Sequence, residues 1–480
     1  MFKQVNDFIK GAAASVGLTG GGAQTGILKF LVTSNKDESK KANLNGQIAA
    51  FLYYESILQD SIRATVTYTD SGIWSPKLGE EGSAEATAVE GLPIVGQENV
   101  DINVTDIKGN ALKMTLYVNK VTPLADDTRK SVVQLDLASK EFIMNEKVRI
   151  NKRFNGKISD HVKKILEEKI YLRTEKEIDI EETSNEQNYI GNNKKPFYII
   201  NWLSRGAVPK DGSTGNTAGY FFWETAKKFY FKSIDALMDS ETNKPKKSYI
   251  YSETSEKQGI PPGYDDKALA YYVNNKVNIK DKLKMGAYST RLITFDPYNC
   301  RYEVTTPNAG NTPGSDSSSK GNEKDLKLAG KELPVLNREF NMDVDGKNKE
   351  FSRTTYYVLD NGSLPSGSGE GEDQEQIEKS KKENYKPGEV LNQGIQRMNQ
   401  LFALETTITI PGDFSLHAGD AVYVDSIKIK DRPSDGSVKK DQQTGGNYVI
   451  ADVCHYVSSK WTLTKLNLVR DSFGRKPKGR

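Results

Sequence analysis

The side chains that could do nucleophilic or metal chemistry are few in this sequence, which has three histidines and two cysteines in 480 residues. Two of them are adjacent, because Cys454 and His455 lie in the segment NYVIADVCHYVSSKWTLTKLNLVRDSFG near the C-terminus. A thiol beside an imidazole could act as nucleophile and base, or supply two ligands to a zinc ion. The alternating apolar residues around the pair predict a β-strand, in which neighbouring side chains project to opposite faces. We therefore expect neither a catalytic dyad nor a shared metal here.

The other histidines and the second cysteine also lack partners at a recognisable spacing. His161 is predicted on the polar side of a helix and His417 in a turn, and no HExxH, CxxC or HxxxH pattern occurs. Cys300 is far from Cys454 in sequence, and two such cysteines cannot build a disulfide framework, which fits a reducing compartment. We expect surface or core histidines, with no catalytic residue, no cofactor-binding residue and no metal site.

Other catalytic signatures are missing from the sequence as well. It contains no GxxxxGK followed by Ser or Thr, no GxGxxG between a strand and a helix, and no GxSxG. Acidic pairs such as Glu80–Glu81 and Glu181–Glu182 are interpreted as solvated charge, although sequence cannot show whether carboxylates face one another across a cleft. A basic tail that is interpreted as solubilising closes the chain: Arg475, Lys476, Lys478 and Arg480.

Length and composition indicate a folded protein of two or more domains. Single hydrophobic cores stop growing near roughly 250–300 residues, and 36% hydrophobic with 27% charged residues is close to globular norms. The 67 Lys and Arg residues nearly balance the 64 Asp and Glu residues, so net charge singles out neither nucleic acid nor an anionic membrane as the partner. Residues 1–25 are predicted to form a short amphipathic helix and a flexible linker. We expect no signal peptide and no membrane span, and therefore a soluble protein or a subunit of a soluble assembly.

Apolar residues at every second position predict β-strands through the first part of the chain. The pattern is clearest in SIRATVTYTD (61–70) and VDINVTD (100–106), and it recurs in KMTLYVNKV and SVVQLDLAS. An antiparallel sheet or barrel with one face in water is expected. Between residues 156 and 170 the period becomes helical, with Ser159 as the predicted N-cap and an apolar stripe of five residues: Ile158, Val162, Ile165, Leu166 and Ile170.

The middle and the second half of the chain are predicted to be β-rich too. Aromatic residues favour strands in PFYIINWL (196–203) and GYFFWETAKKFYFKSIDAL (219–237). A second β region is expected from about residue 269 to the C-terminus, interrupted by the polar tracts 306–322 and 361–374, which are predicted to be long mobile loops. A helix is predicted at 390–405 because apolar residues recur there at a spacing of three to four: Leu391, Ile395, Met398, Leu401 and Phe402.

Two halves that each contain one helix and many strands suggest an internal duplication. Residues 117–139 and 448–470 support it, since both begin with Tyr-Val, pass through a polar turn and end in a strand with apolar residues at alternate positions. Chance similarity between hairpins stays an alternative. In the second half, FSLHAGDAVYVD (414–425) predicts a tight turn, with Gly419 at a positive φ and Asp420 as its cap.

Several of these stretches, taken in order, resemble the baseplate hub proteins of contractile-tailed bacteriophages, in particular those of T4-like cyanophages. In the first half the resemblance is carried by ILKFLVTSNKDESK, FLYYESILQDSIRATVTYTDSG, EGLPIVGQENVDINVTD, FNGKISDHVKKIL and IGNNKKPFYIINWLS. Towards the C-terminus it is carried by TITIPGDFSLHAGDAVYVD and NYVIADVCHYVSSKWTLTKLNLVRDSFG. It extends from about residue 26 to about residue 474.

The resemblance implies a mainly β fold of the β-rich α+β class, with two tail-tube-like β-barrel domains and smaller connecting domains. The division expected on this basis is an N-terminal helix and flexible linker at 1–25, a first barrel at 26–140, a connecting α+β region at 141–268, and a second barrel at 269–480. Long disordered loops are expected in the second barrel near 306–333 and 361–388.

The resemblance also implies a structural role without catalysis. Three copies would form a ring of pseudo-sixfold symmetry that adapts the sixfold tail tube to the threefold central spike. The implied partners are a homotrimer, the central spike protein, tail tube or tube-initiator proteins, baseplate wedge proteins, and genomic DNA passing through the channel without specific binding. The implied location is the virion, after assembly in the host bacterial cytoplasm. Near-neutral charge is consistent with DNA passage without sticking, as a hypothesis.

Two functions from other classes are alternatives. A tail-associated enzyme could degrade host peptidoglycan or polysaccharide with Asp and Glu residues that no motif reveals. A surface module could bind glycans through some of the 23 tyrosines and 4 tryptophans, although most aromatic residues lie in alternating strands, which favours core packing. Release of soluble cell-wall fragments would indicate the enzyme, and binding to a glycan array would indicate the module.

Overall fold

The computed structural model describes residues 26–70, 88–92, 94–127, 130–210, 217–239, 241–252, 260–275, 278–286, 290–297, 300–305, 353–359, 387–427, 441, 443–458 and 461–471. The helix and linker predicted at 1–25, the pair Glu80–Glu81, the basic tail, and all but the last two residues of the loops predicted near 306–333 and 361–388 lie outside the described residues. Strands predominate in what is described, which confirms the β-rich fold class.

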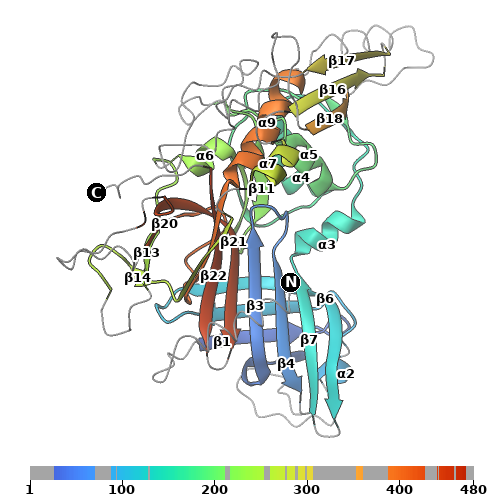
Figure 1. Cartoon of the computed structure of the whole chain (residues 1–480). Coiled ribbons are helices and arrows are strands. Elements are labelled where there is room, and N and C mark those ends of the chain that lie inside the picture. Colours follow the sequence, from blue (N-terminus) through green and yellow to red (C-terminus); the bar gives the residue numbers. More distant parts are fainter. Residues whose placement is uncertain are drawn as a thin grey trace, which may run out of the picture.

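Seven strands between residues 26 and 138 form the N-lobe, the lower half of the molecule in Figure 1. They are β1 (Gly26–Thr33), β2 (Lys41–Asn43), β3 (Ile48–Ser56), β4 (Arg63–Asp70), β5 (Asn99–Thr105), β6 (Ala111–Asp127) and β7 (Lys130–Ala138). Their order in the sheet is β2-β1-β5-β6-β7-β4-β3, and every pair is antiparallel. The connections contain the 3-10 helix η1 (Asn45–Gln47) and the short helix α2 (Ala88–Gly91).

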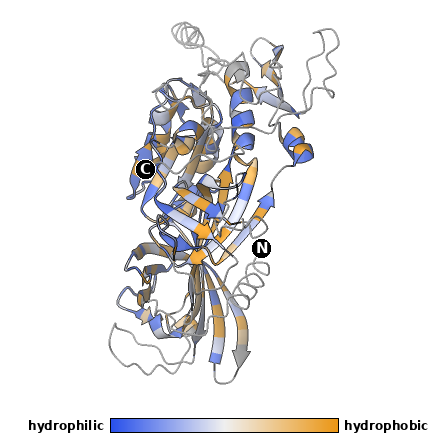
Figure 2. Cartoon of the chain, turned by 60° about the vertical axis from the view of Figure 1, so that its left-hand side comes forward, coloured by the Kyte–Doolittle hydropathy of each residue, from blue (hydrophilic) through white to orange (hydrophobic). Residues whose placement is uncertain are grey.

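The alternating apolar residues of the N-lobe face one shared core, to which all seven strands contribute. In β4, for example, Ala64, Val66 and Tyr68 are buried, as the sequence pattern predicts. Figure 2 shows the resulting bands of hydrophobic and hydrophilic residues along the strands. The rings of Phe30 in β1 and Phe51 in β3 lie 6.3 Å apart, so the two ends of the sheet approach each other around the core.

Seven further strands form the C-lobe. They are β13 (Lys247–Tyr251), β14 (Asp266–Lys267), β15 (Ala270–Asn275), β19 (Leu404–Pro411), β20 (Ala421–Ser426), β21 (Gly446–Ser458) and β22 (Thr462–Arg470). Their order is β14-β13-β20-β21-β22-β19-β15. A second core of buried apolar residues from β13 and β19–β22 fills this lobe.

The two lobes repeat the same strand order. Taken in chain order, β13, β14, β15, β19, β20, β21 and β22 occupy the places of β1 to β7. Only β13 runs the other way, because it is parallel to β14 and β20 where β1 is antiparallel to β2 and β5. The two hairpins that the sequence comparison aligned, β6–β7 and β21–β22, each contain a bulge, after Val118 and after Ile450. The sheet topology therefore confirms the predicted internal repeat.

A middle region of helices and short strands lies between the lobes in sequence. Its helices are α3 (Lys140–Lys147), α4 (Ile158–Glu167), α5 (Pro196–Ser204) and α6 (Ile234–Met238). Its strands are β8 (Arg153–Phe154), β9 (Glu177–Ile180), β10 (Tyr189–Ile190), β11 (Tyr220–Glu224) and β12 (Lys228–Ser233). The strands predicted within residues 219–237 are confirmed as β11 and β12, whereas the end of that stretch is helix α6.

The strand predicted for PFYIINWL is wrong, because this stretch is helix α5. Pro196 occupies the first turn, where its fixed φ suits a helix and its missing N–H costs nothing. Phe197, Ile200 and Leu203 are buried at three-residue spacing, which gives the helix one apolar side. A short apolar run with aromatic residues fits a strand or a buried helix equally well, and here tertiary packing decides.

Helix α4 confirms the predicted helix but differs at both ends. It begins at Ile158, so Ser159 is inside the helix and is not its N-cap, and the backbone N–H of Ser159 donates instead to Thr183 Oγ1 at 3.0 Å. The predicted stripe is buried as far as Leu166, but Ile170 lies beyond the helix and is 53% exposed.

A small three-stranded sheet and two helices interrupt the C-lobe between β15 and β19 (top of Figure 1). The sheet contains β16 (Thr290–Asp296), β17 (Arg301–Thr305) and β18 (Arg353–Val358) in the order β17-β16-β18. The helices are α7 (Ile279–Met285) and α9 (Pro387–Leu401). Helix α9 confirms the helix predicted at 390–405, but it ends at Leu401, and the last two residues of the predicted range belong to β19. Since β13 and β14 precede residue 269, strands of the C-lobe begin upstream of the expected second barrel. The division of the chain into domains stays a prediction.

Gly419 has the positive φ that the sequence predicts, +89°, in the turn before β20. A Cβ atom there would lie 2.5 Å from Cζ2 of Trp223, whose buried indole N–H donates to the Ala418 carbonyl at 3.0 Å. Gly419→Ala therefore combines a strained backbone with an overlap against a fixed ring. We expect it to lower the free energy of unfolding by about 2–4 kcal/mol in urea denaturation. As a control, Gly46→Ala, with nothing within 4 Å of its Cβ, should change stability by less than about 1 kcal/mol. Equal midpoints for the two variants would contradict this account.

Candidate functional site

The two lobes are joined where β3 of the N-lobe pairs with β21 of the C-lobe. Seven residue pairs, from Asp452 opposite Ser56 to Ser458 opposite Ala50, form an antiparallel ladder. Figure 1 shows β3, β21 and β22 side by side at the centre of the molecule. Through this ladder the strands of both lobes belong to one fourteen-stranded sheet. We call the ladder and the polar groups around it the lobe junction.

Cys454 and His455 lie in this ladder and project to opposite faces, as the sequence predicts. Burial raises the pKa of the Cys454 thiol to about 12, which keeps it protonated at neutral pH. The buried ring of His455 lies parallel to the ring of Tyr53 at 6.0 Å, and its Nδ1 is 2.9 Å from the Thr464 hydroxyl oxygen. These two side chains pack the junction and cannot act on each other.

A buried carboxylate next to His455 connects three parts of the chain. Glu55, at the end of β3, accepts hydrogen bonds from the Tyr53 hydroxyl at 2.7 Å and from the backbone N–H groups of Ala226 at 3.1 Å and Ala418 at 3.0 Å. His417 Nδ1 lies 3.0 Å from the carboxylate, whose side chain is 0% exposed. One side chain of the N-lobe therefore binds groups from the middle region and from the loop that enters β20 of the C-lobe.

The charge state of the junction follows from the contact between Glu55 and His417. Burial alone would raise the pKa of Glu55, but the neighbouring His417 charge and the hydrogen bonds lower it to about 2. Burial alone would lower the pKa of His417, but the Glu55 carboxylate raises it above its ordinary value. An ionised carboxylate paired with a protonated imidazole is the arrangement that both directions favour. His417 therefore lies in the predicted turn, but it is a junction residue rather than a surface one.

A second buried carboxylate, Glu224 of β11, binds the other side of the junction. It accepts hydrogen bonds from the backbone N–H of Ile62 at 3.0 Å, from the Ser139 hydroxyl at 2.8 Å and from the Lys176 ammonium at 2.6 Å. Burial raises its pKa to about 6 although Lys176 opposes the shift. Glu224 thus joins the middle region to the residue before β4 and to the residue after β7.

His161 is not on the polar side of α4, as the sequence had suggested, but is 3% exposed. Its Nε2 lies 2.8 Å from the carbonyl oxygen of Gln187, and its ring meets Phe154 and Tyr189 edge to face at 5.5 Å. Burial lowers its pKa, so the neutral form is favoured. Backbone hydrogen bonds with Gln187 and Gly156 let this polar ring lie in an aromatic core.

The buried His455 makes stability depend on pH. Burial lowers its pKa from 6.5 to about 4, so the unfolded chain takes up a proton near pH 6.5 that the folded chain resists until about pH 4. Stability is therefore fully present above pH 6.5 and is lost as the pH falls towards 4. Compared with His455→Phe, the wild type should lose roughly 2–4 kcal/mol between pH 7 and pH 4 in urea denaturation. Parallel pH curves for the two proteins would show that His455 does not titrate this way.

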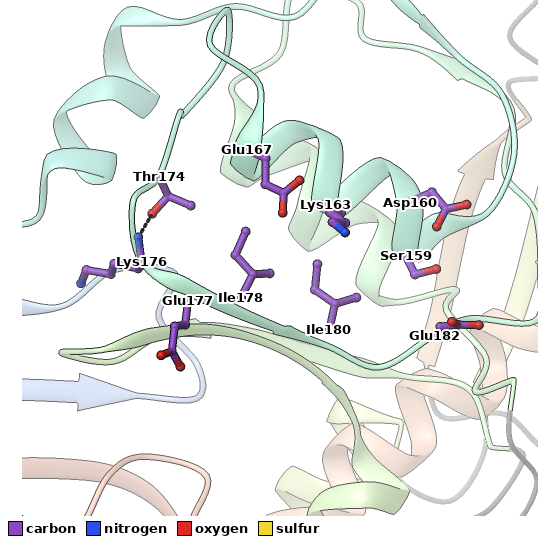
Figure 3. A pocket seen from close by; sticks show the side chains of 10 residues that line it. All are labelled: Ser159, Asp160, Lys163, Glu167, Thr174, Lys176, Glu177, Ile178, Ile180 and Glu182. Carbon is purple, nitrogen blue, oxygen red and sulfur yellow. Dashed lines mark hydrogen bonds between the residues drawn. The ribbon is translucent and has the colours of Figure 1, made fainter.

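An open cleft of about 500 Å³ lies between α4 and β9 in the middle region. In Figure 3, Ile178 and Ile180 point from β9 towards α4, and the charged side chains surround them. Two of its carboxylates are paired with lysines outside the cleft, Glu177 with Lys228 at 2.7 Å and Glu182 with Lys210 at 2.6 Å. Those lysines lower the pKa of both carboxylates, which is the opposite of what the acid of a glycosidase needs.

Two observations concern cofactors and membranes. Within the described ranges, no group of three or more His, Cys, Asp or Glu side chains could hold a metal ion. No helix in the described part of the chain is long and apolar enough to cross a membrane.

The small sheet presents an exposed apolar face. Phe295 pairs with Tyr302 on one side and Val358 on the other, so the three side chains share this face. Phe295 is 43% exposed, Tyr302 is 70% exposed and Val358 is 61% exposed. Tyr356 and Val304 both pair with Ile293 and extend this face. Tyr356 is 76% exposed and Val304 is 40% exposed. The opposite face, with Leu292 and Thr290, is buried against α9.

The residues that matter most at the junction, Glu55 and Glu224, were not singled out from the sequence. A signal was present in FLYYES, because Glu55 follows Phe51 and Tyr53 at positions that face the core. A carboxylate in a core-facing position of a strand must have partners, since an isolated charge is too costly to bury. In YFFWE every residue is buried, so no alternation marked Glu224.

No protein-family model and no curated protein match this sequence. Solved structures of similar fold include a tail protein from Neisseria meningitidis MC58, with 9% identity, a TM-score of 0.46, and coverage of 92% of this chain and 96% of that chain. The 43 kDa tail protein of prophage MuSo2 from Shewanella oneidensis has 10% identity and a TM-score of 0.45, with coverage of 92% of this chain and 98% of that chain. The E. coli c3393 protein has 10% identity and a TM-score of 0.40, with coverage of 90% of this chain and 77% of that chain. That protein is a component of the type VI secretion system and exhibits structural similarity to the T4 bacteriophage tail proteins gp27 and gp5.

Proposed function

We propose that this chain is a structural subunit of a contractile phage tail, the baseplate hub, and that three copies form a ring of pseudo-sixfold symmetry around a DNA channel. The observation that carries the proposal is the repeat: two lobes with the same strand order, joined in one sheet where β3 of the N-lobe pairs with β21 of the C-lobe. Three copies of such a chain offer six similar lobes to a sixfold tube and three identical chains to a threefold spike. The sequence resemblance to hub proteins points to the same assembly.

The lobe junction supports a mechanical role over a catalytic one. Its two buried carboxylates are bound by backbone N–H groups and side chains from three parts of the chain, which leaves them no site for a substrate. Such contacts fix the angle between the lobes, because any rotation would strip a buried charge of its partners. A subunit that sets the symmetry of a ring needs a fixed angle between its repeats.

The finer parts of the proposal concern partners and place. The ring would bind the central spike on one side, the tail tube or its initiator on the other, and wedge proteins around its rim, in a virion assembled in the host cytoplasm. DNA would pass through the channel without specific binding. This last point is tested by DNA binding to the assembled ring at several salt concentrations. Weak binding is expected, and tight binding with a steep salt dependence would count against it.

The solution mass of the purified chain tests the assembly. A mass of three times the 53.4 kDa chain, about 160 kDa, is expected at micromolar concentration. A protein that stays at 53.4 kDa even at high concentration would contradict the ring. Incubation with purified cell wall completes the test, because steady release of soluble sugar or peptide fragments would favour the alternative of a tail-associated enzyme.

Glycan binding is a second candidate function, which the exposed face of the small sheet favours. Aromatic rings are the usual platforms for sugars, and Phe295, Tyr302 and Tyr356 lie exposed on this face. If the face binds glycans, an array should show binding that Tyr302→Ser and Tyr356→Ser remove. An array without any signal would contradict glycan binding and leave only the structural role.

A further inference from the structure

The open cleft between α4 and β9 is held in shape at both of its ends. At one end the backbone N–H of Ser159, in the first turn of α4, donates to Thr183 Oγ1 at 3.0 Å. At the other end the backbone N–H of Thr174 donates to the carbonyl oxygen of Leu166, in the last turn of α4, at 2.9 Å. Because Thr183 follows β9 and Thr174 precedes it, the helix runs antiparallel to the strand and is tied to the chain beyond each end of it. Between these two ties the cleft is open (Figure 3).

The strand that borders the cleft is the last one of its sheet. The order of that sheet is β11-β12-β9, and among the described residues no strand pairs with the outer edge of β9. The backbone N–H of Glu181, directly after β9, donates to the Phe231 carbonyl of β12 at 2.9 Å. In a parallel strand the backbone groups of successive residues point to opposite edges. Counting back from Glu181, those of Ile178 and Ile180 point away from β12, towards the outer edge.

A neighbouring segment shows that this edge accepts a partner. Just beyond β9, Thr183 lies opposite Pro209 in an antiparallel bridge. The Lys210 N–H donates to the Glu182 carbonyl at 3.0 Å, on the side away from β12. The outward backbone groups of β9 continue the same line, but none of the described residues pairs with them. The edge therefore has an antiparallel partner beyond β9 and offers the same kind of contact along β9.

The charges around the cleft favour a basic partner. Its lining contains four carboxylates and two lysines: Asp160, Glu167, Glu177, Glu182, Lys163 and Lys176. The ammonium group of Lys176 is 2.6 Å from the buried carboxylate of Glu224, so it does not balance the carboxylates of the cleft. Asp160 and Glu167 are exposed, and no described residue forms an ion pair with either. They are seven residues apart, which puts them on the same side of α4.

The spacing of these two carboxylates fits a strand that lies along β9. Seven residues of an α-helix rise about 10.5 Å, and four residues of a β-strand rise about 13 Å. Two long basic side chains on one face of such a strand, four residues apart, can therefore reach Asp160 and Glu167. The residue midway between them on that face would lie beside Ile178 and Ile180, which are apolar and half-buried. The cleft volume of about 500 Å³ is in the range of binding clefts.

We propose that the cleft docks an extended segment of a neighbouring tail protein, which adds as an antiparallel strand to the outer edge of β9. The segment has a basic residue, an apolar residue and a second basic residue at alternate positions. Its backbone bonds to the outward groups of Ile178 and Ile180, its apolar side chain packs on theirs, and its basic side chains face Asp160 and Glu167. In strand addition the backbone bonds supply affinity and the alternate side chains supply specificity. That the segment belongs to a tail protein rests on the proposed function, whereas the docking itself does not.

Synthetic peptides test the mode of binding. The basic peptide Thr-Lys-Thr-Val-Thr-Lys-Thr, with both ends blocked, has the proposed pattern and should bind the purified chain saturably in fluorescence anisotropy. The acidic peptide, with Glu in place of both Lys, should bind at least about tenfold more weakly because its charges repel Asp160 and Glu167.

Methylation of the peptide backbone shows whether the peptide binds as a strand. Only alternate N–H groups of a strand point to one neighbour. Methyl groups on the nitrogens of one alternate set of residues should therefore abolish binding, and methyl groups on the other set should not. The docking is overturned if the basic peptide does not bind, if the acidic peptide binds equally well, or if the two methylated sets behave alike.

Charge exchange on the protein tests the position of the site. Asp160→Lys plus Glu167→Lys should weaken binding of the basic peptide at least about tenfold and should make the acidic peptide the better ligand. As a control, Glu146→Lys plus Glu168→Lys changes the net charge by the same amount outside the cleft, and both affinities should stay within about threefold of the wild type. All four side chains are at least partly exposed, so both variants should keep the wild-type urea midpoint. Equal effects of the two variants would overturn the assignment to the cleft.

The solution mass separates this inference from the proposed ring. An assembly of three chains that does not bind the basic peptide overturns the docking cleft and leaves the ring in place. A chain that stays monomeric but binds the basic peptide, with the expected response to the cleft variant, overturns the ring and leaves the docking cleft in place.

Discussion

Glu55→Ala is expected to lower the free energy of unfolding by about 3–5 kcal/mol. The substitution leaves the Tyr53 hydroxyl and two backbone N–H groups buried without their acceptor, and it leaves the imidazolium of His417 without its counter-ion. Because these groups come from three parts of the chain, the loss should appear as an earlier and less cooperative unfolding transition in urea, followed by tryptophan fluorescence.

Two comparisons separate the role of the Glu55 charge from that of its shape. Glu55→Gln keeps an acceptor oxygen and should cost about half as much as the alanine variant. The pKa of Glu55 is lowered from 4.5 to about 2, so its stabilising contribution is present above pH 4.5 and is lost as the pH falls towards 2. The difference between wild type and Glu55→Gln should shrink over that range. The exposed Glu177→Ala is the matched control, at about 0–1 kcal/mol. If Glu55→Ala were no worse than this control, the junction would not depend on the carboxylate.

Arg397→Leu is expected to have an effect of similar size, about 3–5 kcal/mol. Arg397 is a 2% exposed residue of helix α9, and its guanidinium lies 3.2 Å from Asp235 of α6 and 3.9 Å from Asp471 at the end of β22. Both aspartates are buried, and removing the arginine leaves two negative charges in the interior without their cation. The urea midpoint should fall accordingly.

A second substitution tests whether the charge or the packing of Arg397 matters. In Arg397→Leu plus Asp235→Asn one of the two uncompensated charges is removed, so the double variant should recover part of the lost stability. The exposed Lys228→Ala, which breaks only a surface pair with Glu177, should stay within about 1 kcal/mol of the wild type. A double variant that is less stable than Arg397→Leu would show that charge burial is not the cause.

The strands were predictable where one face of a strand meets the core. In β4 and β5 the alternation of apolar and polar residues gives both the strand and the buried face, because the side-chain period of two is local information. The repeat of the β6–β7 and β21–β22 hairpins could be seen for the same reason, since each is a contiguous segment. Helix α5 was missed because a short apolar run does not distinguish a buried helix from a strand.

The partners of the elements could not be predicted, because pairing between distant segments leaves no local trace. Nothing in FLYYES or DVCHYV shows that β3 and β21 lie side by side, although the ladder between them joins the two lobes. Helix α9 illustrates the same limit. Its apolar stripe was predicted, but Ile395 and Met398 are only half-buried, and the most deeply buried residues include polar ones that bind other segments: Asn392, Gln393, Gln396, Arg397 and Gln400.

The most direct measurement of the central claim is a single-particle reconstruction of the purified assembly at a resolution that separates strands. The account predicts a closed ring of three chains in which six lobes of like topology alternate around a channel, with a β3–β21 ladder inside each chain. Particles that are monomeric, or a ring in which the N-lobe and C-lobe occupy unlike positions relative to the axis, would contradict it.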